Sequence, residues 1–203
     1  MNSIRTWQAT AITGALLIAA NTAAFAANGD AKAPSAPPSA PSTSTVQVLH
    51  RSATYQADFA RFTQSLEKIL GHYPPDVQQD VVERPQKAEE RLRAAEGAQG
   101  LMIFLVFDHG AALNMVGARR NAKQYLIGNP LTAIQMTEHD IRAALYAPLR
   151  VLVYEQPEGR TVVEYDQPSS LFGQFGRQDV TSVALSLDAK LEQVLVQAAA
   201  LSH

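Results

Sequence analysis

The chain has 203 residues, of which 46% are hydrophobic, and it carries 17 basic against 19 acidic residues. A formal net charge of −2 and the lack of a basic stripe argue against nucleic acid as a partner, because nucleic-acid binding relies on clustered Lys and Arg. The sequence contains no cysteine, which excludes disulfides, thiol nucleophiles and a lipidated cysteine anchor.

The first 26 residues are predicted to be a signal peptide. Arg5 is the only charge in a short n-region, residues 9–20 are apolar, and Ala24-Phe25-Ala26 has the small-x-small pattern of a cleavage site. The alternative is a retained N-terminal anchor, although the apolar run is short for a membrane span, and no later stretch approaches the roughly 20 apolar residues that a transmembrane helix needs. We therefore expect an exported, periplasmic protein with no membrane span after signal cleavage.

Residues 27–44 are predicted to be a disordered linker. They include four prolines and no large apolar side chain, so they cannot bury enough surface to offset the entropy of ordering. A Pro/Ala/Ser composition favours an extended tether. The remaining residues, 45–203, have the length of one domain with a single core.

Apolar spacing within this domain predicts an α+β fold. A period of two or a short apolar run indicates strands at 45–50, 101–107, 123–127, 149–155 and 161–166. A period near 3.6 indicates helices over 55–71, 111–118, 131–147 in one or two pieces, and 180–201. A charged, exposed helix is expected to be inserted at about 74–97. We expect one antiparallel-rich sheet of about five strands packed against helices, with a β-α-β4-α core.

Four ordered blocks of sequence resemble a known family. They are Phe107-Asp108-His109-Gly110-Ala111-Ala112, Leu126-Ile127-Gly128-Asn129-Pro130, the block 147–155 that begins Ala147-Pro148, and Val163-Glu164-Tyr165. Over about residues 45–195 the chain resembles the bacterial and archaeal domain of unknown function 302. The resemblance implies a single α+β domain related to the TATA-binding-protein-like layout, and a homodimer. It implies no agreed reaction, and the stretch 73–97 and the export signal depart from the family pattern.

Asp108-His109 at the end of a predicted strand has two interpretations. A carboxylate beside an imidazole can move a proton or bind a metal, which makes both residues catalytic candidates. Alternatively, Asp108 caps the following helix. His109 and His139 are the metal-ligand candidates, but no HxxxH, HxH or HExxH spacing supports them, so a metal site would require residues distant in sequence to converge.

The turn Gly128-Asn129-Pro130 also has two interpretations. Asn129 and nearby amides can face a ligand at a helix start, or the segment is a plain strand-to-helix turn with proline as the first helical residue. Arg150 can contact a carboxylate ligand or pair with a neighbouring acid, and Tyr154 can line a pocket or pack across strands. Ser169-Ser170 lacks a GxSxG context, which disfavours a serine hydrolase.

Three functional hypotheses follow, and the lack of catalytic motifs favours a protein that is not an enzyme. The first is a periplasmic small-ligand-binding or interaction module, with a cavity between sheet and helices lined by Phe107, Asn129, Arg150 and Tyr154. The second is an envelope enzyme that uses Asp108-His109 as an acid/base pair or a metal-assisted site. The third is a non-catalytic dimeric scaffold. The sequence specifies no cofactor.

Overall fold

The computed structural model describes residues 40–202, of which residues 44–202 belong to one compact unit. The predicted signal peptide and most of the predicted linker lie outside the described residues. The strands are β1 (His50–Tyr55), β2 (Gly71–His72), β3 (Met102–Asp108), β4 (Ala122–Gly128), β5 (Leu149–Glu155) and β6 (Thr161–Asp166). The α-helices are α1 (Phe59–Ile69), α2 (Val77–Glu83), α3 (Pro85–Ala94), α4 (His109–Leu113), α5 (Pro130–Thr137), α6 (Pro168–Phe172) and α7 (Gln178–Ala200). Short 3-10 helices are η1 (Ala98–Gly100), η2 (Asn114–Val116), η3 (Ile141–Tyr146) and η4 (Gly173–Phe175).

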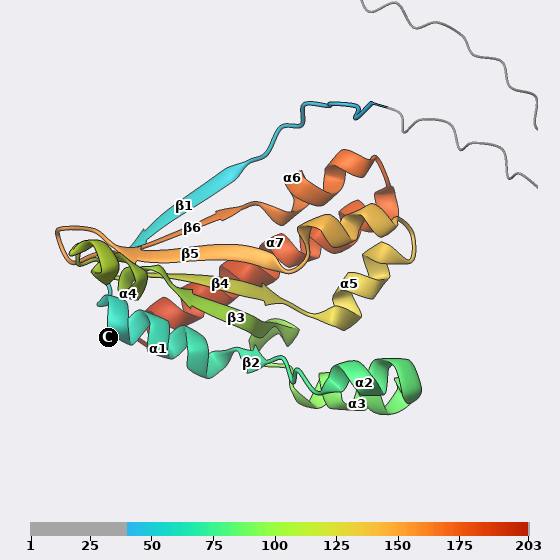
Figure 1. Ribbon diagram of the computed structural model, residues 1–203, viewed down its shortest axis with the longest axis horizontal. Coiled ribbons are helices and arrows are strands. Elements are labelled where there is room, and N and C mark those ends of the chain that lie inside the picture. Colours follow the sequence, from blue (N-terminus) through green and yellow to red (C-terminus); the bar gives the residue numbers. More distant parts are fainter. Residues whose placement is uncertain (1–39, 203) are drawn as a thin grey trace, which may run out of the picture. The chain divides into compact units, whose positions relative to one another are not determined.

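The strands form one sheet in the order β1-β6-β5-β4-β3-β2 (Figure 1). Neighbouring strands are antiparallel, except that the short β2 runs parallel to β3. The β4–β5 register pairs Ile127 with Leu149, so the end of β4 lies beside the start of β5. This pairing brings together two of the sequence blocks on which the family resemblance was based.

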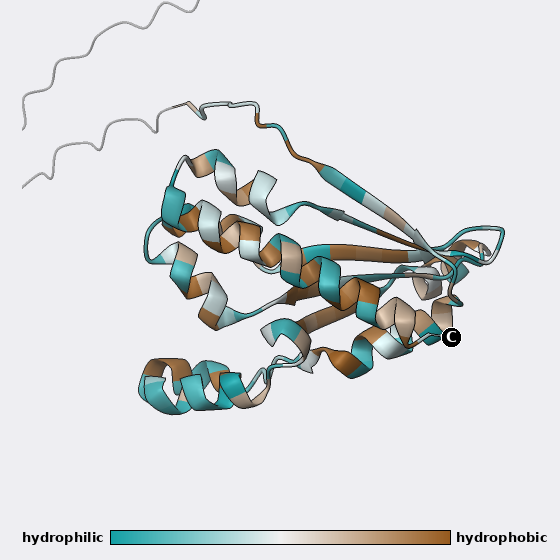
Figure 2. Ribbon diagram, turned by 180° about the vertical axis from the view of Figure 1, so that it is seen from behind, coloured by the Kyte–Doolittle hydropathy of each residue, from teal (hydrophilic) through white to brown (hydrophobic). Residues whose placement is uncertain are grey.

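The main core lies between the sheet and the helices α1 and α7, which are seen in front of the sheet in Figure 2. Phe62 and Leu66 of α1 are fully buried, as the helical spacing predicts. Tyr125 of β4 is also fully buried, and its hydroxyl donates to Glu67 Oε1 over 2.8 Å. Burial and the neighbouring Glu67 raise the pKa of Tyr125 well above its usual value. Tyr125 therefore stays neutral and holds α1 against the sheet.

The other face of the sheet remains accessible. Leu105 and Phe107 of β3 are each 45% exposed, and Arg150 of β5 is exposed. The antiparallel registers pair Leu105 with Leu126 and Leu126 with Arg150, so these side chains share one face. We call this surface, made of Leu105, Phe107, Leu126, Arg150 and the polar residues beside them on β5, β6 and β1, the open face.

Helices α2 and α3 form a hairpin with a small core of its own, in which Val77, Ala88 and Leu92 pack with Met102 of β3. It is the mostly hydrophilic pair of helices at the bottom of Figure 2. Its root is a close backbone contact between Gly71 and Gly97. A Cβ on Gly97 would lie 2.0 Å from the Gly71 nitrogen, so both positions require the absence of a side chain.

The predicted α+β class and single sheet are confirmed. The first strand is not at 45–50 but at His50–Tyr55, because that segment pairs with β6. Helix α1 begins only after Asp58, whose side chain accepts the Arg61 N–H at 3.0 Å. The region predicted as one inserted helix contains two, separated at Arg84, with Pro85 starting the second. The two-residue β2 and helix α6 were not predicted.

Within residues 40–202, none of the helices combines the length and the apolar character that crossing a membrane requires.

Candidate functional site

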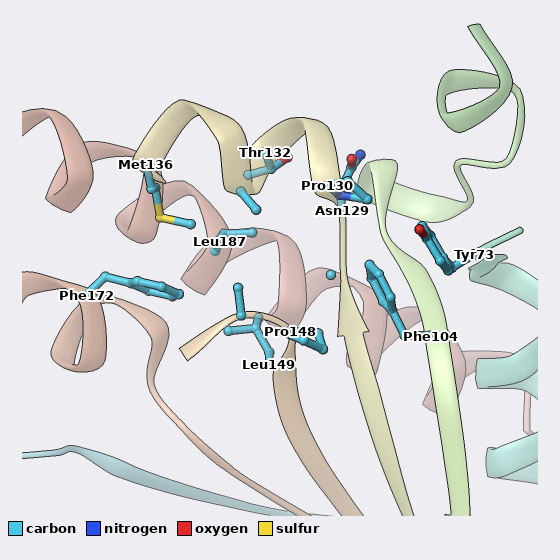
Figure 3. Close-up of a pocket in the computed structure, with 13 residues that line it drawn as sticks. Tyr73, Phe104, Asn129, Pro130, Thr132, Met136, Pro148, Leu149, Phe172 and Leu187 are labelled. Atoms are coloured by element: carbon cyan, nitrogen blue, oxygen red, sulfur yellow. The ribbon is translucent and has the colours of Figure 1, made fainter. Parts of the chain in front are cut away.

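The candidate site is an apolar cavity of about 260 Å³ next to α5, which we call the α5 cavity (Figure 3). It lies where β4 ends and β5 begins, and helices α5, α6 and α7 complete its walls. The lining residues are Tyr73, Phe104, Gly128, Asn129, Pro130, Thr132, Ala133, Met136, Ala147, Pro148, Leu149, Phe172 and Leu187. None of them carries a charge, so the cavity suits apolar surface and not ions.

Local sequence explains why the cavity forms at this point. Gly128 ends β4, and a Cβ there would sit 3.5 Å from both Phe104 and Pro148, so glycine leaves space that a side chain would occupy. Pro130 is the first residue of α5, where its missing N–H costs nothing. Pro148, which follows a cis peptide bond, directly precedes β5 on the neighbouring strand. The chain therefore leaves the sheet after β4 and enters it at β5 at the same end of the sheet.

The walls are made of well-packed side chains. Met136, Phe172 and Leu187 are buried members of the main core. The rings of Tyr73 and Phe104 stack with centroids 4.6 Å apart and an interplanar angle of 16°, and both are partly exposed. This stacked pair connects the cavity to the segment between β2 and α2. Core packing and ring stacking therefore hold the walls of the cavity in place.

Asn129 is buried, with 7% of its surface exposed, and its side chain is fully hydrogen-bonded. Its Oδ1 accepts the Leu131 N–H at 2.8 Å and so caps α5. Its Nδ2 donates to Glu96 Oε1 and to the Gly100 carbonyl, each at 2.7 Å. These bonds use both donors of the amide. In this structure Asn129 joins β4, α5 and the end of the α2–α3 region.

The polar groups on the cavity wall are few. The Tyr73 hydroxyl donates to Gln78 Oε1 at 2.9 Å. Thr132 is half-buried on α5 and also lines a second hollow, with Glu96, Gly100 and Lys190. With so few polar groups on the wall, shape sets most of the fit of a ligand.

The α5 cavity includes Asn129 but not the other predicted ligand-binding residues. Phe107 and Arg150 are on the open face, and Arg150 borders a separate hollow with Leu126, Leu145 and Asp166. The Tyr154 hydroxyl donates to Glu164 Oε1 at 2.9 Å, and this hydrogen bond raises the pKa of Tyr154. The structure does not bring these four residues to one cavity.

Asp108 and His109 lie at the opposite end of the strands from the α5 cavity. Asp108 Oδ1 accepts the Ala111 N–H at 2.7 Å. Asp108 therefore caps α4, which was the second of its two interpretations from the sequence. His109 is exposed, and its ring is 6.3 Å from that of Phe107. His139 lies in the turn after α5, with Nδ1 3.4 Å from Asp179. Among residues 40–202, no group of three or more His, Cys, Asp or Glu side chains is placed to hold a metal ion.

Sequence reasoning missed most of the cavity wall, notably Tyr73, Phe104 and Pro148. The signal for Pro148 was present, because Ala147-Pro148 precedes a predicted strand just as Gly128-Asn129-Pro130 follows one. Only the antiparallel pairing of β4 with β5 shows that the two segments are neighbours. For Tyr73 the sequence offers no signal beyond the following prolines.

Replacement of Asn129 tests its structural role. Asn129→Ala removes the α5 cap and both bonds of Nδ2, so we expect it to lower the free energy of unfolding by about 1–3 kcal/mol. Asn129→Ser retains a capping oxygen and should lose less. Urea denaturation of the three proteins measures the difference. An Ala variant as stable as the wild type would contradict the assignment.

Comparisons with known proteins place the chain in a family. The sequence model of the family described as "Domain of unknown function DUF302" matches residues 77–198, which include the α2–α3 hairpin that the sequence suggested to be an insertion. A crystal structure of an uncharacterized conserved DUF302 protein from Bacillus stearothermophilus matches with a TM-score of 0.53 and 15% sequence identity, covering 73% of this chain and 96% of that one. At that identity the likeness shows the shared fold alone. No curated protein matches the sequence. Since the family model covers more than half of the chain, the protein belongs to the DUF302 family.

Proposed function

We propose that this DUF302 protein binds a small, uncharged and largely apolar molecule in the α5 cavity. The observation that carries the proposal is a cavity of about 260 Å³ whose lining includes no charged side chain. An ionised ligand would lose its hydration there without gaining a partner, which disfavours it strongly. An apolar ligand, in contrast, gains roughly 25 cal/mol for each Å² removed from water.

Gly128 provides a way to reduce the cavity without disturbing the fold. A Cβ there would meet Phe104 and Pro148 at ordinary van der Waals distance, so Gly128→Ala should fold while occupying part of the ligand space. Gly173→Ala is the matched control, because its Cβ would have a nearest neighbour 4.0 Å away and Gly173 does not line the cavity. Neither glycine has a positive φ angle.

The test uses benzyl alcohol as the probe and benzoate as its charged counterpart. We expect benzyl alcohol to raise the thermal unfolding midpoint of the wild type and of Gly173→Ala in a concentration-dependent way, and to raise that of Gly128→Ala much less. Benzoate should have little effect on any of them. Equal responses of the two variants to benzyl alcohol, or equal responses of the wild type to both compounds, would refute the proposal.

We also propose that the protein acts in the periplasm. Support comes from Arg5, the apolar run 9–20 and the cleavage pattern at 24–26. Expressed without an N-terminal tag, the protein should appear in the periplasmic fraction. Its mass, measured by mass spectrometry, should be that of a chain that begins at Ala27. Recovery of the intact chain from the cytoplasm would count against export.

A second proposal is that the open face pairs with a second copy to form a homodimer. Leu105 and Phe107 expose apolar surface there, and Arg150 lies 3.9 Å from Asp166 on the same face. Asp166 also accepts from His50 at 3.1 Å, which raises the pKa of His50. A surface carrying both charge signs around apolar side chains can be complementary to itself across a two-fold axis.

The dimer proposal is tested by placing a charge on the open face. At micromolar concentration, sedimentation equilibrium should give a dimer for the wild type and a monomer for Phe107→Glu, because two glutamates would be buried close to one another. Leu185→Glu, at a residue of α7 that is 54% exposed, serves as the control and should remain dimeric. A monomeric wild type would contradict the proposal.

A further inference from the structure

A second cavity, of about 430 Å³, lies at the opposite end of the sheet beside α4. Its walls come from the ends of β3 and β5, the start of β4, helix α4 with the loop that joins it to β4, and the first residue of α1. The lining residues are Phe59, Asp108, Gly110, Ala111, Asn114, Arg119, Arg120, Asn121, Ala122 and Glu155. We call it the α4 cavity. Unlike the α5 cavity, it is surrounded by charged and amide side chains.

The backbone around the α4 cavity is held in place by close contacts. A Cβ on Gly110 would lie 2.2 Å from the Arg120 carbonyl oxygen, so the absence of a side chain allows α4 to pack directly on the arginine segment. The Ala118 N–H donates to the Leu113 carbonyl at 3.1 Å, and the Glu155 N–H donates to the Asn121 carbonyl at 3.0 Å. The loop that carries both arginines is therefore hydrogen-bonded to α4 before the arginines and to β5 after them.

The arginines of this cavity have no carboxylate partner in the structure. Neither Arg119 nor Arg120 takes part in an ion pair within residues 40–202, although the cavity wall contains two carboxylates. Both arginines border the cavity, and a guanidinium without a carboxylate partner can donate several hydrogen bonds to an anionic group.

Each carboxylate on the wall keeps one oxygen available. Asp108 uses Oδ1 to accept the Ala111 N–H, and Glu155 uses Oε2 to accept from Asn121 Nδ2 at 2.7 Å. Asp108 Oδ2 and Glu155 Oε1 accept no hydrogen bond from another described residue. These oxygens suit an ammonium group. A simple anion would be attracted by the arginines and repelled by the carboxylates, so it gains little.

From this arrangement we infer that the α4 cavity is a second binding site and that it takes a small zwitterion of the amino-acid class. The carboxylate of the ligand binds Arg119 and Arg120, and its ammonium group binds Asp108 and Glu155. Two arginines and two acidic residues among the lining residues match the two charges of such a ligand. The site is separate from the α5 cavity and does not depend on what binds there.

The test is an NMR titration of the chain with three related compounds. L-serine carries both charges, 3-hydroxypropionate lacks the ammonium group, and ethanolamine lacks the carboxylate. We expect L-serine to shift the amide signals of Gly110, Ala111 and Asn121, and to bind at least about tenfold more tightly than either of the other two compounds. Equal affinity for L-serine and 3-hydroxypropionate, or shifts absent from these amides, would overturn the inference.

Three variants separate the two halves of the site. Asp108→Asn retains the oxygen that caps α4 but loses the charge, so it should weaken L-serine binding and strengthen 3-hydroxypropionate binding. Arg120→Ala should weaken both by about tenfold or more. Arg61→Ala, an exposed arginine of α1 outside the cavity, should leave both affinities unchanged. An Asp108→Asn variant that binds L-serine as the wild type does would also overturn the inference.

Discussion

The packing of α1 and α7 against one face of the sheet is the constraint on which the rest of this structure depends. It buries the inward-facing residues of the central strands, among them Tyr125, Val151 and Val163, in one core. Because the covering helices are committed to that face, the other face is left to its own alternating side chains. Cavities can then form where the chain leaves the sheet, at the ends of the strands, since the middle of the covered face is filled.

The two cavities occupy opposite ends of the same strands and have opposite character. The α5 cavity lies at the end of β4, whereas the α4 cavity lies at its start, and a seven-residue strand separates the two by roughly 20 Å. One wall is apolar and uncharged, and the other carries two arginines and two carboxylates. The sheet keeps these two environments apart, as the two proposed sites for chemically unlike molecules require.

Local pattern was sufficient to predict the class of the fold and most strands, because burial on one face imposes alternation along a strand and a 3.6-residue period along α1 and α7. The first strand was misplaced because residues 45–50 also alternate, and only pairing with β6 selects 50–55. For the sites, the sequence identified Asp108 and Asn129 at strand ends. It could not show that Pro148 adjoins Gly128 or that Arg119 and Arg120 border the same space as Glu155, because those relations arise from strand pairing between distant segments.

The contact between Gly71 and Gly97 has a consequence for protein engineering. Beyond this glycine pair, the α2–α3 hairpin is attached to the rest of the chain through Met102, the packing of Tyr73 and Leu131, and the hydrogen bond from Asn129 to Glu96. Otherwise it packs on its own small core. The turn at Arg84, between the two helices, lies at the end of the hairpin away from this root. A reporter domain inserted at that turn would be held away from the sheet by the α2–α3 hairpin. Gly71 and Gly97 are the residues of this region that cannot be substituted in such a fusion.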